Sequence, residues 1–391
     1  MRIAILGGGA SGLYSAILLK KKHPKDEVVV FEKEAKIARK LYATGNGHCN
    51  LLNASLSPSA FNDPKGVSPY LARYPFPLLE KTLKEWGVET LHEGDYVYPL
   101  SYSAGTYVSF LLQLAEHLGV RFVSGVRVLD YETKGQGFCL KIDANPAPMD
   151  LTFDKIVLAM GGASSPKLGS DGKSVSFLRL HGYDLVPFEP GLAPIKVSHP
   201  EILKGMAGYR HEGKVSLLSK EGKPLYEEAG EILFKDDGLS GIVLFNVESV
   251  YLRLGKPVGA QIQLDLFPEQ SEKELAAQLL ADQKKNPSFY LDAYFPLDVQ
   301  PHFKKAAQGE EAVALAHALK NDRYVISGVY GFESSQVSVG GVKLSEVDSS
   351  LESKKEKGVY FVGEVLNVDG FCGGFNLSWA LVSALVLEEG L

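Results

Sequence analysis

Three glycines near the start of the chain have the spacing of a turn that binds a dinucleotide. Gly7, Gly9 and Gly12 fit the pattern GxGxxG, after the apolar run at residues 2–6 and before a helical apolar pattern. The first glycine of such a turn allows a tight bend, the second lets the backbone approach a diphosphate, and the third lets the helix pack on its strand. Free N–H groups and the positive dipole end of the helix favour the diphosphate. We therefore expect a diphosphate-binding turn here.

An acidic residue follows at the distance that a ribose contact requires. Residues 27–31 (EVVVF) form a second apolar run, and Glu32 lies directly after it, 20 residues beyond Gly12. At this separation an acidic side chain meets a ribose 2′-hydroxyl. Glycine turns also join strands to helices in proteins without a ligand, but here strand, turn, helix, second strand and acid agree. The pattern predicts FAD or NAD rather than NADP.

The composition is that of an ordinary globular protein. The 391 residues are 45% hydrophobic and 23% charged, which excludes disordered and fibrous classes. This length suggests about two or three domains. The formal net charge of −6 disfavours a nucleic-acid partner or an anionic membrane. The three cysteines have no spacing typical of disulfides or zinc, so we expect no metal and a reducing compartment.

The uncharged run at residues 3–19 has the length of a signal-peptide core. However, it contains four glycines, no small-residue cleavage site follows it, and residues 20–22 are three lysines. No other run reaches the roughly 18 apolar residues of a membrane span. We expect a cytoplasmic protein with no membrane segment.

The segment after the second apolar run has the composition of a binding loop. Residues 33–53 (KEAKIARKLYATGNGHCNLLN) are rich in glycine, asparagine and threonine, where an ordinary NAD fold would continue into its next helix. Its side chains offer positive charge to a phosphate and hydrogen bonds to a ribityl chain. These side chains are Arg39, Lys40, Thr44, Asn46 and Asn50. The alternative is a solvated polar loop.

Two further apolar strands end in glycine. Residues 155–162 predict a strand that stops at two glycines, and residues 358–363 predict another that stops at one. Glu364 is then placed to hydrogen-bond a ribityl hydroxyl. The glycines at 373–374 open a final apolar helix, whose N-terminus is suited to the N1–C2=O edge of a reduced flavin. Strand ends at both extremes and in the middle of the chain predict one discontinuous domain around a long cofactor.

Four longer motifs resemble a known family. They are KLYATGNGHCN at 40–50, LAMGGASSPKLGSDG at 158–172, QVSVGGV at 336–342 and GVYFVGEVLNVDGFCGGFNLSWA at 358–380. Together they are similar to the bacterial flavoprotein family that includes FAD-dependent aminoacetone oxidases and bile-acid-inducible reductive flavoenzymes. The resemblance spans nearly the whole chain. It implies FAD, held in a three-layer cofactor domain that is interrupted by a barrel-like insert with a small helical segment.

Two positions depart from that family pattern. His48 stands where arginine is usual, and Asn367 stands where aspartate is usual. Both lie in cofactor motifs, so they put polar contacts near the cofactor in question and leave the glycine framework intact. Loss of the aspartate argues against a proton-transfer role for position 367.

The motifs and the family resemblance together define the candidate cofactor-binding residues. These are Gly7, Gly9, Ala10, Ser11, Gly12, Glu32, Lys33, Lys40, Thr44, Asn46, Gly47, Asn50, Val128, Ala159, Gly161, Gly162, Gly363, Glu364, Gly373, Gly374, Phe375 and Asn376. No catalytic side chain and no metal ligand is assigned.

Other side chains carry alternative interpretations. Cys49 and Cys372 lie in cofactor motifs, but without a resolving cysteine nearby they are better explained as small packed side chains than as redox groups. His48 is either a proton carrier or phosphate contact, or an ordinary loop histidine. Tyr324 and Tyr330 either line a substrate pocket or, as strand aromatics usually do, pack in a core.

The middle of the chain lacks the alternation of strands and helices. Short strand patterns lie at 214–218, 231–235, 260–266 and 324–331, and helical patterns lie at 242–252, 271–284 and 310–319. We therefore predict an α/β protein. Its parts are a discontinuous Rossmann-like FAD-binding domain (1–190 and 337–391), an antiparallel β-barrel-like insert (191–268 and 322–336) and a helical segment (269–321).

These features predict a FAD-dependent oxidoreductase that transfers hydride between a small organic substrate and flavin N5. Of the activities that the family resemblance implies, we favour an aminoacetone-type amine oxidase that uses oxygen. The alternative is an NAD(P)H-dependent reductase that acts on a C=C bond. No second GxGxxG occurs, so NAD(P)H would dock only transiently over the flavin. A flavin-bearing redox sensor or partner-binding module, and less so a FAD-dependent tRNA-modifying enzyme, also remain open. The expected partner is a small molecule, and the oligomeric state is undetermined.

Overall fold

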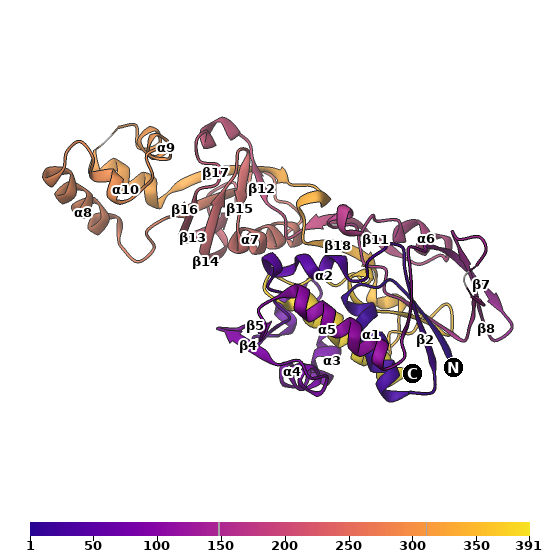
Figure 1. Cartoon of the computed structure of the whole chain (residues 1–391). Helices are drawn as coiled ribbons and strands as arrows, with labels where there is room; N and C mark the ends of the chain where they lie inside the picture. The colour runs from indigo at the N-terminus through magenta and orange to yellow at the C-terminus, as the bar shows by residue number, and fades with distance from the viewer. Residues whose placement is uncertain (148, 310) are drawn as a thin grey trace. The chain divides into compact units, whose positions relative to one another are not determined.

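The chain divides into two units, one of which is inserted into the other. The computed structural model describes residues 1–147, 149–309 and 311–391. The Rossmann unit comprises Met1–Pro190 and Gln336–Leu391, and the barrel unit comprises Gly191–Ser335 (Figure 1). The barrel unit is therefore a single insertion between two halves of the Rossmann unit.

Five parallel strands form the central sheet of the Rossmann unit, in the order β19-β10-β1-β2-β6. Ile5 in the middle strand lies opposite Val30 on one side and Val157 on the other. Parallel strands are usually covered on both faces, which explains why these runs are almost continuously apolar. The strands are β1 Arg2–Leu6, β2 Glu27–Glu32, β6 Arg121–Ser124, β10 Lys155–Leu158 and β19 Val359–Phe361.

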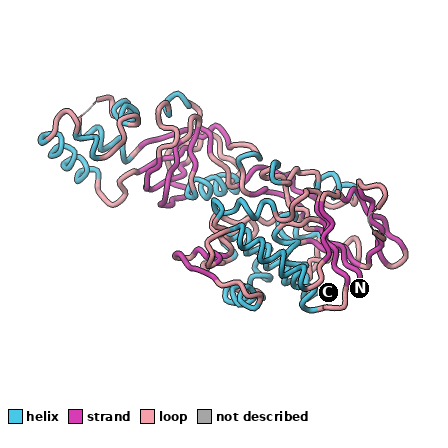
Figure 2. Tube along the Cα trace, viewed as in Figure 1, coloured by secondary structure: helices cyan, strands magenta, loops and turns pink. Residues whose placement is uncertain are grey.

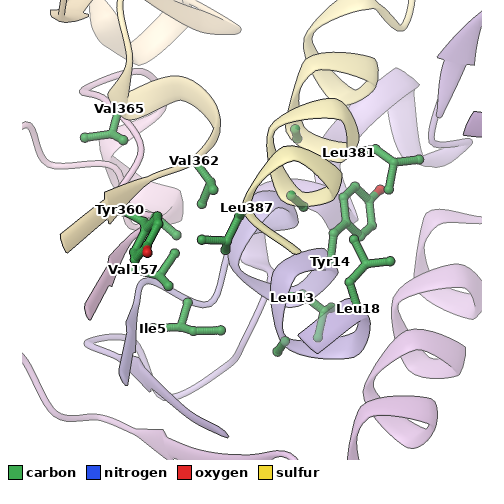
Figure 3. Close-up of a cluster of buried hydrophobic side chains, with 14 of the residues drawn as sticks. Ile5, Leu13, Tyr14, Leu18, Val157, Tyr360, Val362, Val365, Leu381 and Leu387 are labelled. Carbon is green, nitrogen blue, oxygen red and sulfur yellow. The ribbon is translucent and has the colours of Figure 1, made fainter. Parts of the chain in front are cut away.

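Helices α1 (Ala10–Lys22) and α11 (Phe375–Gly390) pack against each other and against this sheet. Leu13 from α1 and Leu381 and Leu387 from α11 belong to one buried cluster with the strand residues (Figure 3). Each of the three leucines is 0% exposed, and burying such a side chain contributes about 1.5–3 kcal/mol. Helix α5 (Ala104–His117) also packs on α1. The two ends of the chain are thus joined in one core.

Smaller elements complete the Rossmann unit. They include two antiparallel three-stranded sheets, β3-β5-β4 and β7-β8-β9, and the pair β11-β18, along which the chain leaves and returns. The bounds are α2 Arg39–Ala43, β3 Leu52–Asn53, α3 Pro64–Arg73, α4 Phe76–Glu85, β4 Thr90–Glu93, β5 Tyr96–Pro99, β7 Val128–Lys134, β8 Gly137–Ile142, β9 Thr152–Phe153, α6 Ser174–Leu180, β11 Leu185–Gly191 and β18 Val337–Val342.

Six strands of the barrel unit close into an antiparallel barrel in the order β12-β15-β14-β13-β16-β17, with β17 paired to β12. Inward and outward residues alternate, as in β16, where Ile262 and Leu264 are buried. Helix α7 (Ile242–Arg253) contributes to the same core. The strands are β12 Ile195–Val197, β13 Arg210–Leu218, β14 Pro224–Phe234, β15 Gly238–Ser240, β16 Gln261–Asp265 and β17 Asp322–Val329. The predicted fold class, a Rossmann-like sheet with an antiparallel barrel, is confirmed.

Between β16 and β17 the described residues form helices and loops without a strand (Figure 2). Helix α8 (Glu272–Lys285) begins at the predicted cap, where the Ser271 Oγ accepts a hydrogen bond from the Glu274 N–H at 3.3 Å. Helices α9 (Gln300–Ala306) and α10 (Ala312–Lys320) follow, and α10 packs on α8. The first residue of the predicted helix at 310–319 lies outside the described residues.

A cluster of titratable side chains ties β7 to the end of α6. Tyr131 and Tyr183 each donate a hydrogen bond to Glu356 Oε2 at 2.7 Å, and His181 lies 3.0 Å from Asp130 and 3.4 Å from Glu356. Burial lowers the pKa of His181, but the two carboxylates outweigh burial and hold it above its ordinary value. Burial raises the pKa of Glu356, but hydrogen bonds from His181 and the two tyrosines bring it down to about 2.

This cluster makes stability depend on pH at two places. His181 has a higher pKa in the folded protein than in the unfolded chain, where it is about 6.5. Its contribution to the free energy of unfolding is therefore complete below about pH 6.5 and is lost as the pH rises through the folded pKa. The lowered pKa of Glu356 means that its contribution is complete above its ordinary pKa of 4.5 and is lost as pH falls toward about 2. Urea unfolding measured across pH should show both losses. In His181→Gln the loss on the alkaline side should disappear; a loss that persists unchanged would contradict the assignment.

Candidate functional site

The glycine turn after β1 is tight at two positions and open at a third. Gly7 has φ +116°, and a Cβ there would lie 2.3 Å from the carbonyl oxygen of Ala159. A Cβ on Gly12 would lie 2.0 Å from the carbonyl oxygen of Gly7. A Cβ on Gly9 would meet no atom within 4 Å, so free space lies beside this residue at the N-terminus of α1. These are the three separate roles of glycines in a dinucleotide-binding turn.

Glu32 lies beside this turn at the end of β2. Its Oε2 accepts a hydrogen bond from the Gly8 N–H at 2.9 Å, and its Oε1 accepts one from the Glu34 N–H at 2.9 Å. A carboxylate has about four acceptor sites, so these two bonds leave capacity for a ribose hydroxyl. Arg39, a candidate phosphate contact, pairs instead with Glu34 at 2.5 Å.

Lys33 and Val128 lie near the same end of the sheet. Lys33 Nζ pairs with Asp171 at 2.7 Å, and Asp171 also pairs with Arg127 at 2.9 Å. Burial raises the pKa of Asp171, but hydrogen bonds from the two cations lower it to about 2. Val128 is buried at the start of β7. Lys33 is thus held by a local ion-pair network.

Lys40 and Glu364 join the predicted binding loop to the end of β19. Their charged atoms lie 3.0 Å apart. Ser164 Oγ accepts a hydrogen bond from Lys40 Nζ at 2.7 Å and lies 3.1 Å from Glu364 Oε1, to which it can donate. The Ser338 N–H also donates to Glu364 Oε1, at 2.7 Å. The sequence singled out Lys40 and Glu364 but not the two serines, because no local pattern indicates partners so distant in the chain.

The three glycine-marked strand ends approach one another closely. A Cβ on Gly162, after β10, would lie 2.3 Å from Ser338 Oγ. A Cβ on Gly363, after β19, would lie 2.4 Å from Ser11 Oγ in the first turn of α1. Gly161 has φ +64° and Gly363 has φ +73°, conformations that favour glycine. Glycine at these positions therefore allows the end of β10 to lie against β18, and the end of β19 to lie against the first turn of α1.

The first turn of α11 is half-exposed, whereas the helix is buried from Ser378 to Leu387. Gly373 and Gly374 precede it with φ +117° and +94°, and a Cβ on Gly374 would lie 2.5 Å from a carbonyl oxygen of β3. Asn376 holds the preceding loop, because its Oδ1 accepts from the Gly370 N–H at 2.9 Å. Phe375 is half-exposed in the same turn. The free N–H groups of this turn thus lie at an accessible surface.

The predicted binding loop has an unusual backbone. Gly45 and Asn46 have φ +56° and +52°, and the Cys49 N–H closes the turn onto the carbonyl oxygen of Thr44 at 3.0 Å. Directly after it, the Oδ1 of Asn50 is buried and has no hydrogen-bond partner among the described residues. A buried polar atom without a partner is costly, so this oxygen is suited to a donor on a bound molecule.

The structure also locates the two departures from the family pattern. His48 is exposed, stacks on Tyr102 with ring centroids 4.2 Å apart, and places Nδ1 3.0 Å from the Tyr102 carbonyl oxygen. This geometry favours the ordinary loop histidine. Asn367 accepts hydrogen bonds from Asn62 Nδ2 at 3.3 Å, so it links two loops. Beside His48, a Cβ on Gly47 would meet no atom within 4 Å.

These features fit the diphosphate, ribose and flavin of FAD. The free space at Gly9, the unpartnered Oδ1 of Asn50 and the half-exposed first turn of α11 are three places where a ligand would complete the structure. The backbone at Gly9 and Ser11 would hold the diphosphate, Glu32 the ribose, and the start of α11 the negative edge of a reduced flavin. Bound FAD supplies hydride transfer to or from a substrate.

Cys49 lies in the core, in agreement with the interpretation that it is a small packed side chain and not a redox group. It is buried, and burial raises the pKa of its thiol to about 12, although a hydrogen bond from Thr44 lowers it. The thiol therefore stays protonated, and so poorly nucleophilic, in the neutral range. Iodoacetamide should therefore alkylate the half-exposed Cys372 in the native protein and spare Cys49, as read by peptide mass spectrometry. Both should react in urea; equal labelling in the native protein would contradict the burial of Cys49.

Tyr324 packs in the barrel core, which is the alternative that strand aromatics favour, and it does not line a pocket. It is 1% exposed, and its hydroxyl donates to Asp322 Oδ2 at 2.5 Å. Tyr330 is half-exposed, hydrogen-bonds Asp237, and lies under Lys196 with the ammonium 5.1 Å from the ring centroid.

Neither a membrane span nor a metal site is found in the part of the chain that the structure describes. No helix there is long and apolar enough to cross a membrane. No group of His, Cys, Asp and Glu side chains there is arranged to hold a metal ion.

Comparison with known proteins decides the family. Residues 1–389 match the model of the HI0933-like protein Rossmann domain. The chain belongs to the HI0933-like family. The predicted membership of a bacterial flavoprotein family is confirmed, and the chain is a FAD-dependent oxidoreductase.

Two relatives of this HI0933-like protein cover nearly its whole length. A 3-dehydro-bile acid delta(4,6)-reductase of Clostridium scindens is 32% identical, over 97% of this chain and 96% of the relative. A ribosomal RNA dihydrouridine synthase of Escherichia coli is 27% identical, over 99% and 97%. Among solved structures, 3-ketosteroid delta1-dehydrogenase from Sterolibacterium denitrificans has a TM-score of 0.52 at 12% identity, over 99% of this chain and 98% of that chain. This last likeness shows the shared fold alone.

Proposed function

We propose that this HI0933-like protein reduces a C=C bond conjugated to a carbonyl group, with FAD as the hydride carrier. The observation that carries the proposal is the 32% identity to a 3-dehydro-bile acid delta(4,6)-reductase along nearly the whole chain. The same chemistry applies to two kinds of substrate. In one, a 3-keto group is conjugated to ring double bonds; in the other, the C5=C6 bond of a uracil is conjugated to its C4 carbonyl. In both, the far alkene carbon is electron-poor, so it takes a hydride while the near carbon takes a proton.

The residues of the site support a reductive flavoenzyme of this kind. The first turn of α11 presents N–H groups and a positive dipole end at an accessible surface, which would stabilise a reduced, anionic flavin. Neither of the two relatives named above is an amine oxidase by name. Oxidation of aminoacetone therefore stays a prediction with less support than reduction of an enone.

A cyclic enone of small-molecule size is the substrate class that we favour. The net charge of −6 provides no broad attraction for an RNA backbone. Reduction of uridine in RNA is the second candidate, because a relative at 27% identity is named a ribosomal RNA dihydrouridine synthase. Electrons would come from NAD(P)H, which would dock transiently, since the sequence has a single GxGxxG turn.

An anaerobic two-step titration tests the proposal. The flavin-loaded protein is first titrated with NADH and NADPH while the visible flavin bands are followed, and the reduced protein is then mixed with a 3-keto-Δ4 steroid or with ribosomal RNA. A separate sample of the oxidised protein is mixed with aminoacetone. Bleaching by a nicotinamide followed by reoxidation by the steroid, with a product that has gained a pair of hydrogens, is the expected result. Reduction of the oxidised flavin by aminoacetone, without turnover of any enone, would overturn it.

A further inference from the structure

Reduction of a conjugated C=C bond needs a proton donor as well as a hydride, and β5 presents a candidate beside the predicted cofactor motifs. Tyr96 and Tyr98 alternate with the buried Val97 and Pro99, so the two tyrosines share the half-exposed face of the strand. This alternation is visible in the sequence, but it lies outside the cofactor motifs.

The half-exposed face of β5 lies between two predicted cofactor motifs. A Cβ on Gly373, before α11, would lie 2.7 Å from the Tyr96 ring. A Cβ on Gly45, in the binding loop, would lie 4.0 Å from Tyr98 Cε1. The Cys372 thiol is near enough to Tyr98 to influence its ionisation. Tyr98 therefore stands between the loop and the start of α11, the two places assigned to the flavin.

The hydroxyl of Tyr98 differs from the other acidic groups around it. No described residue forms a hydrogen bond with it, and it is not sealed from solvent. The Tyr102 hydroxyl already donates to Glu93 at 3.1 Å, and the Cys372 thiol is directed at Gln336 Oε1 at 3.7 Å. Ring contact with Tyr102, at 4.9 Å between centroids, holds the Tyr98 ring in place. Its hydroxyl is thus fixed in position and available to a ligand.

We propose that Tyr98 is the proton donor of the C=C reduction, an inference that rests on the proposed function. Once a hydride, which bound reduced FAD would supply, has reached the carbon remote from the carbonyl, the alkene electrons move toward the carbonyl oxygen. The Oη–H bond of Tyr98 then breaks as a C–H bond forms at the carbon next to the carbonyl. Tyr98 is left as a phenolate, which recovers its proton from water. An enolate is a stronger base than a phenolate, so the transfer runs downhill.

The protonation state of Tyr98 agrees with this role. Burial raises the pKa of its hydroxyl to about 12, with the neighbouring Tyr102 and Glu93 adding to the effect. The group therefore carries its proton throughout the neutral range. A histidine or an unperturbed thiol would lose its proton near pH 6.5 or 8.5 instead.

Tyr98→Phe tests the proposal, with Tyr102→Phe as the matched control for loss of a hydroxyl in the same ring pair. Each protein is loaded with FAD, its flavin content and affinity are measured, and it is reduced with dithionite and mixed anaerobically with a 3-keto-Δ4 steroid. Tyr98→Phe should keep flavin content and affinity but reoxidise about 100-fold more slowly. Tyr102→Phe should stay within about threefold of the wild type.

The outcomes separate this inference from the proposed function. If the reduced wild type is reoxidised by no conjugated alkene, the proposed function fails. If the wild type reacts and Tyr98→Phe reacts equally fast, the inference fails while the function stands. A pH profile of the wild type adds a test that needs no variant: reoxidation should be level between about pH 6 and 10, and a fall centred near pH 6.5 or 8.5 would overturn Tyr98 as donor.

Discussion

Gly9→Val is expected to weaken FAD binding strongly while leaving the protein folded. The backbone of Gly9 has φ −75° and ψ −169°, an extended conformation that valine adopts readily. Its Cβ would meet no atom of the chain within 4 Å, so the added side chain would start from an open position beside the turn. That space is where the diphosphate must approach the backbone. Loss of this approach should weaken FAD affinity about 100-fold or more, which corresponds to about 2.7 kcal/mol.

Fluorescence titration of the apoprotein with FAD measures this effect, and urea unfolding of the apoprotein checks the fold. Replacing the N-cap glycine should cost about 1 kcal/mol of stability at most. Gly12→Ala is the contrasting variant, because its Cβ would lie 2.0 Å from the carbonyl oxygen of Gly7 and must displace backbone. It should lower stability as well as affinity. Wild-type affinity in Gly9→Val would show that the diphosphate does not approach this turn.

Local spacing was enough to predict the part of the fold that surrounds this turn. Residues 2–32 encode a strand, a turn, a helix and a second strand within one stretch of chain, and the structure forms β1, α1 and β2 there. The same holds for α8, whose cap at Ser271 and Glu274 is a pattern of four residues. In these places the interactions that decide the structure join near neighbours, so the sequence shows them directly.

Closure of the barrel could not be predicted in this way. β12 and β15 have three residues each, too short for a recognisable alternation, and β12 exists because it pairs with β15 and β17. The same limit applied to the side-chain partners of the site. Lys40 and Glu364 were named separately from their motifs, but their ion pair joins residues 324 positions apart.

Tyrosines illustrate a different limit of sequence reasoning. Tyr324 in β17 and Tyr98 in β5 both lie on strands with alternating burial. The alternation of residue types in the sequence therefore does not distinguish a tyrosine that packs in a core from one that lines a pocket. The structure separates them, since Tyr324 is 1% exposed and bonded to Asp322, while Tyr98 is half-exposed between two cofactor motifs. Which face of a strand is covered depends on elements far away in the chain, and only the fold specifies it.

Asp322→Ala is expected to produce the largest loss of stability in the barrel unit. Asp322 Oδ2 lies 3.2 Å from His302 Nε2 and accepts a hydrogen bond from Tyr324 at 2.5 Å. Nδ1 of the same histidine lies 2.8 Å from the Ile202 carbonyl oxygen, so both ring nitrogens face acceptors, an arrangement that a protonated ring satisfies. Burial lowers the pKa of His302, but Asp322 and the carbonyl outweigh burial and raise it. His302 and Asp322 are 6% and 8% exposed in their side chains.

Removing one partner of a buried ion pair leaves the other charge without compensation, which costs about 3–5 kcal/mol. Lys214→Ala is the matched control within the barrel unit, because its pair with Glu227 is exposed and should contribute less than about 1 kcal/mol. Both tryptophans, Trp86 and Trp379, lie in the Rossmann unit, so their fluorescence does not report on the barrel. Hydrogen exchange of residues 191–335, followed by mass spectrometry, is therefore the measurement. Faster exchange across α9 and β17 in Asp322→Ala is expected, and unchanged exchange would mean that the histidine is neutral in the folded protein.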